Sequence, residues 1–236
     1  MKKKTIAALG TAAALGVANA VHAATFVPKK KERKILPDEP LNVDRYRKNL
    51  SDAIKIKTIA NPDYDKTDWS QFEAFRNFLD ERYPLIKKNL TREIVPTSNL
   101  VYLWKGTRSD LDPIAMLSHQ DVVPVTEGTE GDWEHDAWEG YDDGEFIWGR
   151  GALDMKNHLI GVMEAVESLL EEGFQPERDV YLCFGENEEI VAGKENGAQK
   201  ICEYLKAKGV HLDCIVDEGG AALPAAGRID PRTPGP

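Results

Sequence analysis

Short apolar runs alternate with stretches of helical periodicity from residue 42 to about residue 220, and this alternation constrains the fold more than any other feature. Each apolar run has the length of a buried strand, and the helical stretches are long enough to cross over a sheet. We therefore predict a three-layer α/β sandwich with a mostly parallel sheet. The expected strands lie at residues 99–105, 113–117, 145–148, 180–184 and 212–216, and the expected helices at residues 44–59, 155–172 and 197–208.

One further helix is predicted from a capping pattern. Ser70 and Glu73 have the spacing of a capping box, so this helix is expected to begin at Ser70. Phe72, Phe75 and Leu79 then share one helical face, as in a helix with one buried side.

Composition excludes several classes of protein. Hydrophobic residues make up 42% of the 236 residues, which together with 19 glycines is an ordinary value for a globular chain. Asp and Glu number 40 against 30 Lys and Arg, and the resulting net charge of −10 argues against a nucleic-acid partner. Three cysteines without close pairing exclude a disulfide framework: Cys183, Cys202 and Cys214.

The first 23 residues have the pattern of a secretory signal peptide. Three lysines at positions 2–4 precede an apolar run over residues 5–21, and small residues end at Ala20 or Ala23, where a signal peptidase would cut. We therefore expect a secreted or periplasmic protein, without stable membrane insertion after cleavage. The alternative is an uncleaved segment that anchors the chain in a membrane. Residues 24–41 are basic and contain prolines, which predicts a linker.

Candidate metal ligands follow three of the expected strands. His119 and Asp121 follow the run at 113–117, and Asp217 follows the run at 212–216. Because the carboxyl ends of strands in an open α/β sheet collect the active groups, these side chains are expected to converge. Each acid alone is explained equally well by a turn or a helix cap, so the joint spacing carries the prediction. The remaining candidates are Glu186, Glu188 and Glu189 after the run at 180–184, and Asp154 before the longest helix.

One histidine among several carboxylates suits a divalent cation, most commonly zinc. Two such ions would need a bridging carboxylate, and a metal-bound water has its pKa lowered toward ~7. A further carboxylate must then take up a proton and pass it to a leaving amine. The adjacent Glu188 and Glu189 could divide these tasks, one facing the metal and one facing the water.

The motifs resemble those of the zinc metallopeptidases that include carboxypeptidase S, Gly-X carboxypeptidase, acetylornithine deacetylase and aminoacylase. Order and spacing match over roughly residues 45–220, and the carboxypeptidase S branch is the most similar. The matching stretches are Ser118-His119-Gln120-Asp121-Val122-Val123-Pro124, Trp148-Gly149-Arg150-Gly151-Ala152-Leu153-Asp154-Met155-Lys156, Glu188-Glu189 and Asp217-Glu218-Gly219-Gly220.

The resemblance implies a role for each motif residue and a di-zinc hydrolase of peptide or N-acyl amino acid amide bonds. His119 and Asp217 would bind one zinc, Glu189 the other, and Asp154 would bridge the two. Glu188 would act as general base. Asp121 would hold the His119 ring from behind. The implied substrates are small peptides or N-acyl amino acids with a free carboxylate.

The sequence departs from the family pattern in two places. Asn187 stands where the family commonly has Asp before the glutamate pair. The sequence also ends at Pro236, whereas the family continues with a lid and dimerisation domain and a last histidine ligand. We therefore expect a partial catalytic domain over residues 42–222, an irregular tail over 223–236, no homodimer interface and impaired catalysis. The alternatives are a non-catalytic metal-binding or interaction module, and a nonfunctional fragment.

Overall fold

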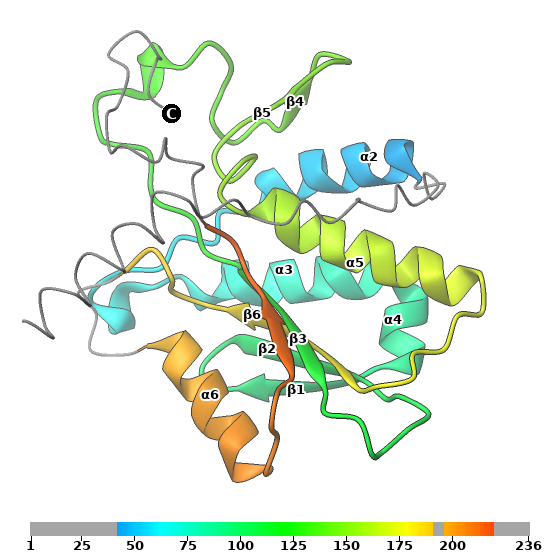
Figure 1. Ribbon diagram of the computed structural model, residues 1–236. Helices are drawn as coiled ribbons and strands as arrows, with labels where there is room; N and C mark the ends of the chain where they lie inside the picture. Colours follow the sequence, from blue (N-terminus) through cyan, green and yellow to red (C-terminus); the bar gives the residue numbers. More distant parts are fainter. Residues whose placement is uncertain (1–41, 191–195, 220–236) are drawn as a thin grey trace, which may run out of the picture. The chain divides into compact units, whose positions relative to one another are not determined.

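The computed structural model describes residues 42–190 and 196–219 (Figure 1). The expected signal peptide at 1–23, the linker at 24–41 and the tail at 223–236 lie outside the described residues and stay predictions. Within residues 42–190 and 196–219, no helix is both long enough and apolar enough to cross a bilayer.

The centre of the described fold is a five-stranded sheet in the order β1-β2-β6-β3-β7. Strands β6, β3 and β7 are parallel, whereas β2 runs antiparallel to both of its neighbours. All strands of this sheet except β2 therefore point the same way, which confirms the mostly parallel sheet. The bounds are β1 Thr91–Val95, β2 Asn99–Trp104, β3 Ile114–His119, β6 Val180–Gly185 and β7 Cys214–Val216.

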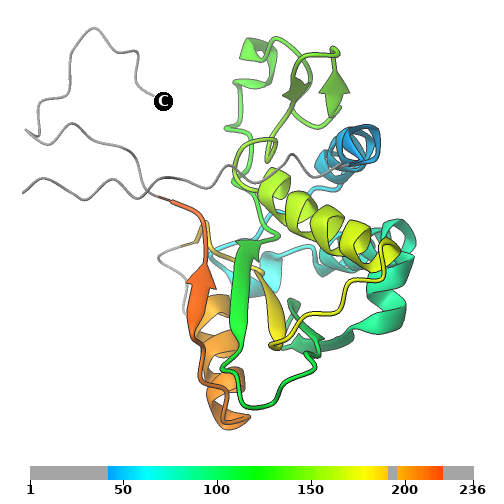
Figure 2. The ribbon, with the colours of Figure 1, turned by 45° about the vertical axis from the view of Figure 1, so that its right-hand side comes forward.

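Helices cover both faces of the sheet (Figures 1 and 2). Side chains alternate along β2, so that Leu100 and Tyr102 join the core beneath α5, while Val101 joins a second core beneath α6. This arrangement confirms the three-layer sandwich. The α5 face carries α2 Val43–Ile54, α3 Trp69–Arg82, α4 Pro84–Asn89 and α5 Lys156–Glu171, and the opposite face carries α6 Gly197–Ala207.

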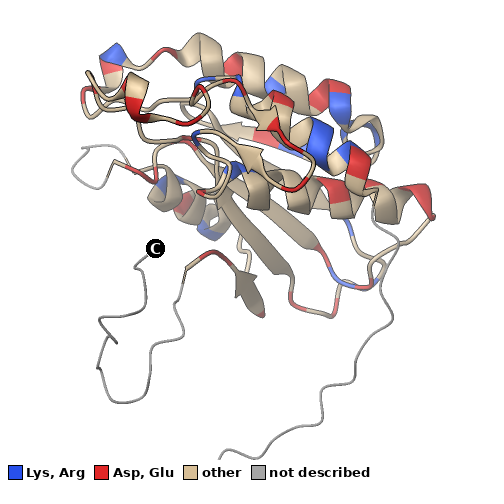
Figure 3. Ribbon diagram, turned by 90° about the horizontal axis from the view of Figure 1, so that it is seen from above, with Lys and Arg blue, Asp and Glu red and all other residues tan. Residues whose placement is uncertain are grey.

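Charged residues of both signs are interspersed on the helices and loops in Figure 3. Arg45 of α2 forms ion pairs with Glu164 and Glu171 of α5, so the two outer helices are also linked across their polar sides. Because these guanidinium and carboxylate groups are paired, they add little free charge to this surface.

Three local predictions differ from the structure. Helix α3 begins one residue early, because Asp68 caps it by accepting the backbone N–H of Ser70 at 3.1 Å, so the capping box at Ser70 is wrong. Helix α2 ends at Ile54 instead of residue 59. The expected strand at 145–148 is shorter and lies in a separate two-stranded sheet, β4 Tyr141–Asp142 with β5 Ile147–Trp148. Two short 3-10 helices, η1 Tyr64–Lys66 and η2 Glu130–Asp132, occupy the connecting loops.

Candidate metal centre

His119 is the last residue of β3, and its ring is buried, with 2% of the residue exposed. Nδ1 lies 2.9 Å from the backbone oxygen of Asp121. A carbonyl oxygen can only accept a hydrogen bond, so Nδ1 carries the hydrogen, and in the neutral ring Nε2 keeps the lone pair that binds a metal.

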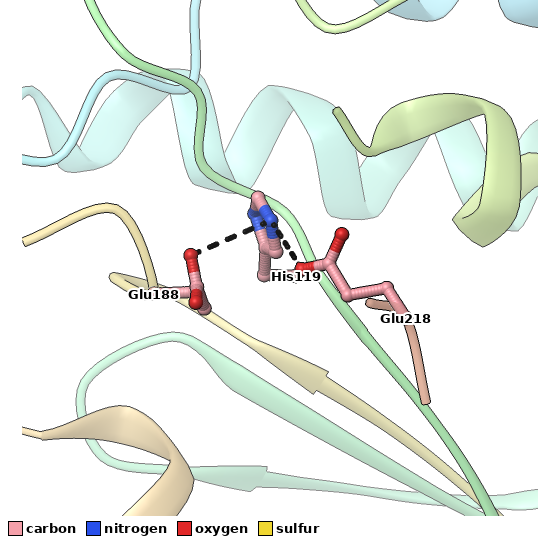
Figure 4. Close-up of side chains that lie close together, drawn as sticks. All are labelled: His119, Glu188 and Glu218. Atoms are coloured by element: carbon pink, nitrogen blue, oxygen red, sulfur yellow. Dashed lines mark ion pairs between the residues drawn. The ribbon is translucent and has the colours of Figure 1, made fainter. Parts of the chain in front are cut away.

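Carboxylates surround the free nitrogen of His119. Nε2 lies 3.1 Å from Oδ1 of Asp154 and 3.3 Å from Oε1 of Glu218. Oε2 of Glu188 is 3.8 Å away, and Figure 4 shows the ring between Glu188 and Glu218. These three side chains come from the turns after β6 and β7 and from the turn before α5, so the convergence expected from the sequence is present.

Asp121 connects the histidine to the glutamate pair. Its fully buried carboxylate lies 3.3 Å from Nδ1 of His119. The same carboxylate accepts the backbone N–H groups of Glu188 at 3.0 Å and Glu189 at 3.1 Å. Asp121 therefore fixes the position of the imidazole and of the turn that bears both glutamates.

Two overlapping groups of donors have the geometry to hold a metal ion. The first is His119, Glu188 and Glu218, and the second is His119, Asp154 and Glu189. Within each group the donor atoms all lie within 4.8 Å of one another. An imidazole nitrogen with carboxylate oxygens suits a borderline or hard divalent cation, so the residues fit the metal that the sequence implied.

The pKa shifts in this cluster reflect burial together with the charges of neighbouring carboxylates. Burial alone would lower the pKa of His119, but the hydrogen bond and charge of Asp121, aided by the charge of Glu218, raise it to about 9. Burial raises the pKa of Glu189, and the charge of Asp154 adds to the increase. Burial likewise raises the pKa of Glu218. A divalent cation would compensate this negative charge.

Asp217 has a different position from the one that the sequence indicated. Its side chain is exposed, and its Oδ1 accepts the backbone N–H of Glu218 at 2.9 Å, which turns the carboxylate back onto its own backbone. Glu218, the next residue, is the acid that lies beside His119. His119, Asp154, Glu188 and Glu189 do come together, and the roles assigned to them, to Asp121 and to Asp217 stay predictions.

Lys156 is a buried charged residue near the site to which sequence reasoning gave no role. Its Nζ donates hydrogen bonds to the backbone oxygens of Ala53 at 2.9 Å and Ile56 at 2.5 Å, where α2 ends. Complete burial lowers the pKa of Lys156 to about 7, and the charge of Asp121 opposes this decrease. The only indication of this position in the sequence is a lysine that directly follows an aspartate and a methionine at a helix start.

Comparison with known proteins supports the same assignment. The profile of "Peptidase family M20/M25/M40" matches residues 115–230. Carboxypeptidase S of Saccharomyces cerevisiae is 36% identical over 181 residues, covering 72% of this chain and 31% of the relative. The N-fatty-acyl-amino acid synthase/hydrolase PM20D1 of Mus musculus is 33% identical over 176 residues, covering 74% of this chain and 34% of the relative. The chain thus spans about a third of the length of these curated relatives.

Solved structures share the fold at low identity. An M20 family metallo-carboxypeptidase from Sulfolobus solfataricus superposes with a TM-score of 0.58 at 18% identity, covering 74% of this chain and 37% of that chain. The di-peptidase Dug1p from Saccharomyces cerevisiae gives a TM-score of 0.56 at 18% identity, covering 74% and 38%. The solved structures support the fold, and the profile match and the sequence relatives show that the chain belongs to peptidase family M20/M25/M40, a family of metal-dependent hydrolases.

Proposed function

We propose that this chain carries the metal centre of a hydrolase that cleaves peptide or N-acyl amino acid amide bonds. The observation that carries the proposal is the position of Nε2 of His119, which faces carboxylates from three separate turns at 3.1 to 3.8 Å. The raised pKa of His119 and Glu189 supports a role beyond structure, because perturbed groups cluster at functional sites.

We propose zinc as the metal, with two ions in a complete site. His119 and Glu218 would contribute to one ion, Glu189 to the other, and Asp154 would bridge them; Asp217 is the alternative ligand from the sequence. A bound zinc supplies a water whose pKa is lowered to about 7. Glu188, whose side chain is 57% exposed, would accept the proton of that water and deliver it to the leaving amine.

The substrate class rests on the relatives. One is named a carboxypeptidase and another an N-fatty-acyl-amino acid synthase/hydrolase. Both names fit an amide bond next to a free amino-acid carboxylate, which we propose as the common feature of the substrate. A nucleic-acid partner does not fit the net charge of −10.

The second candidate is a metal-binding module without catalysis, in which the same donor groups would hold an ion but perform no hydrolysis. One experiment separates the two. The purified chain is equilibrated with Zn²⁺, its metal content is measured by plasma mass spectrometry, and amino acid release is followed from a dipeptide and from an N-acyl amino acid.

Hydrolysis that a chelator abolishes would support the enzyme, and tight zinc binding without hydrolysis would support the module. Glu188→Gln is the matched variant: we expect it to keep its zinc and to lose any hydrolysis. A chain that binds no divalent metal would contradict both candidates.

We also propose that the protein is exported. The lysines at positions 2–4, the apolar run at 5–21 and the small residues before Ala23 support cleavage by a signal peptidase. The mass of the protein recovered from its native host should correspond to a chain that begins at Val21 or Ala24. A full-length mass would instead favour the uncleaved anchor.

A further inference from the structure

We propose that Glu186 is a positioning residue that holds the turn bearing Glu188 and Glu189 in register with His119. Glu186 directly follows β6 and is fully buried, yet it belongs to neither group of metal donors. The inference rests on the proposed metal centre, since it assigns a task in maintaining that centre.

The two side-chain oxygens of Glu186 accept hydrogen bonds from two other segments. Oε1 accepts the backbone N–H of Thr97 at 3.2 Å and the hydroxyl of Tyr64, and Oε2 accepts the backbone N–H of Ser98. A buried acid with this many donors is well satisfied, and three donors on one carboxyl group define its position closely.

The connection between β1 and β2 also binds the segment after His119. Gln120 donates from Nε2 to the backbone oxygen of Ser98 at 2.9 Å. The backbone N–H of Gln120 donates to the carbonyl oxygen of Gly185 at 2.8 Å. Residues 97 and 98 therefore link the turn after β6 to the turn after β3, and Glu186 is the side chain that makes the link on the β6 side.

The same turn is also fixed to β2 by its backbone and to α6 by the side chain of Asn187. The N–H of Glu186 donates to Oδ1 of Asn99 at 3.1 Å, and Oδ1 of Asn187 accepts the N–H of Gly197 at 2.8 Å. A Cβ on Gly197 would lie 2.3 Å from Oδ1 of Asn99, so a larger residue here would displace the Asn99 amide. Because the N–H of Glu186 and the side chain of Asn187 are held in this way, a displacement of the Glu186 side chain would be passed on to Glu188 and Glu189.

Both side-chain oxygens of Glu186 face hydrogen-bond donors, so the residue at this position must offer an acceptor at each. In Glu186→Gln one of them becomes an NH₂ group, which can only donate and would face the backbone N–H of Thr97 in one orientation and that of Ser98 in the other. A buried donor left without an acceptor is destabilising, so we expect the turn to shift away from this contact. Outer contacts that orient metal ligands change metal affinity by about 10- to 100-fold when they are removed.

The test uses the full chain and two readouts. Backbone amide exchange of residues 187–190 is measured without metal, and Co²⁺ affinity is measured from the visible absorption of the bound ion. We expect Glu186→Gln to accelerate exchange at least tenfold and to raise the Co²⁺ dissociation constant at least tenfold, with a smaller change in Tyr64→Phe. Glu93→Gln, the same chemical change at an exposed glutamate of β1, should match the wild type in both readouts.

Unchanged exchange and affinity in Glu186→Gln would overturn the inference, and so would faster exchange with unaltered Co²⁺ affinity. If Glu186→Gln does not fold, Tyr64→Phe provides the test, because it removes one hydrogen-bond donor to Glu186 and leaves the carboxyl group in place. Exchange and Co²⁺ affinity equal to the wild type in Tyr64→Phe would then overturn the inference. A wild-type chain that binds no Co²⁺ would refute the proposed function, whereas the exchange data would still show whether Glu186 holds the turn.

Discussion

The backbone N–H of Glu188 lies 3.0 Å from Oδ1 of Asp121, so the proposed general base is attached to the residue that also holds the histidine. The link joins the ends of β3 and β6, which are adjacent and parallel, with His119 paired to Gly185. Because both strands belong to one sheet, the positions of His119 and of the turn that bears Glu188 are set before any metal binds, as a well-defined site requires.

We predict that Asp121→Asn weakens Zn²⁺ binding by about 10- to 100-fold, because the amide cannot accept hydrogen bonds at both positions. Calorimetric titration of the purified chain would measure this change. Asp112→Asn, an exposed aspartate just before β3, is the control and should leave the affinity unaltered. Equal affinities for the two variants would show that Asp121 does not organise the site.

Glu218 and Asp217 provide a comparison between neighbouring acids. Glu218 lies 3.3 Å from Nε2 of His119, whereas the carboxylate of Asp217 accepts its neighbour's backbone N–H. Glu218→Gln should lower the Zn²⁺ affinity at least tenfold, and Asp217→Asn should change it by less than about threefold. If Asp217→Asn instead lowers the Zn²⁺ affinity more than Glu218→Gln does, Asp217 would be the ligand.

The sandwich and its strands could be predicted because burial on both faces makes central strands apolar. Strands β2, β3 and β6 form the middle of the sheet, and their apolar runs appear directly in the sequence. The sequence did not indicate strand β1 because this strand lies at an edge of the sheet: of its five residues only Val95 is buried, so Thr91–Val95 has no apolar run.

The composition of the site was also predictable, but the orientation of adjacent acids was not. The sequence identified the acids after each strand, since strand ends converge at one edge of the sheet. It could not show that Glu186 points toward Tyr64 and Thr97, or that Glu218 rather than Asp217 points toward His119. These directions depend on hydrogen bonds from segments distant in the sequence.

The three cysteines should differ in reactivity. Burial raises the pKa of the Cys183 thiol to about 12, whereas Cys202 and Cys214 are exposed. At pH 8 the native chain should therefore release two equivalents of thionitrobenzoate rapidly from Ellman's reagent, and a third only after denaturation. Cys183→Ala should leave the native count at two and lower the denatured count to two. Three fast thiols in the native wild type would contradict the burial of Cys183.

Lys156 should make the stability of the metal-free chain depend on pH. Its pKa is about 7 in the folded chain, whereas a solvated lysine in the unfolded chain has a pKa of 10.5. Between these values the unfolded chain binds a proton that the folded chain does not, so the free energy of unfolding increases with pH across this window. In Lys156→Met this contribution is absent.

Urea unfolding in the presence of a chelator would test this dependence. From pH 7 to pH 10 the wild type should gain about 3 kcal/mol relative to Lys156→Met, since each unit of pKa difference corresponds to about 1.4 kcal/mol. Lys88→Met removes an exposed lysine of α4, and its difference from the wild type should stay constant over the same range. Parallel curves for the wild type and Lys156→Met would mean that Lys156 stays protonated in the folded chain, held by the carbonyl oxygens of Ala53 and Ile56 and by the charge of Asp121.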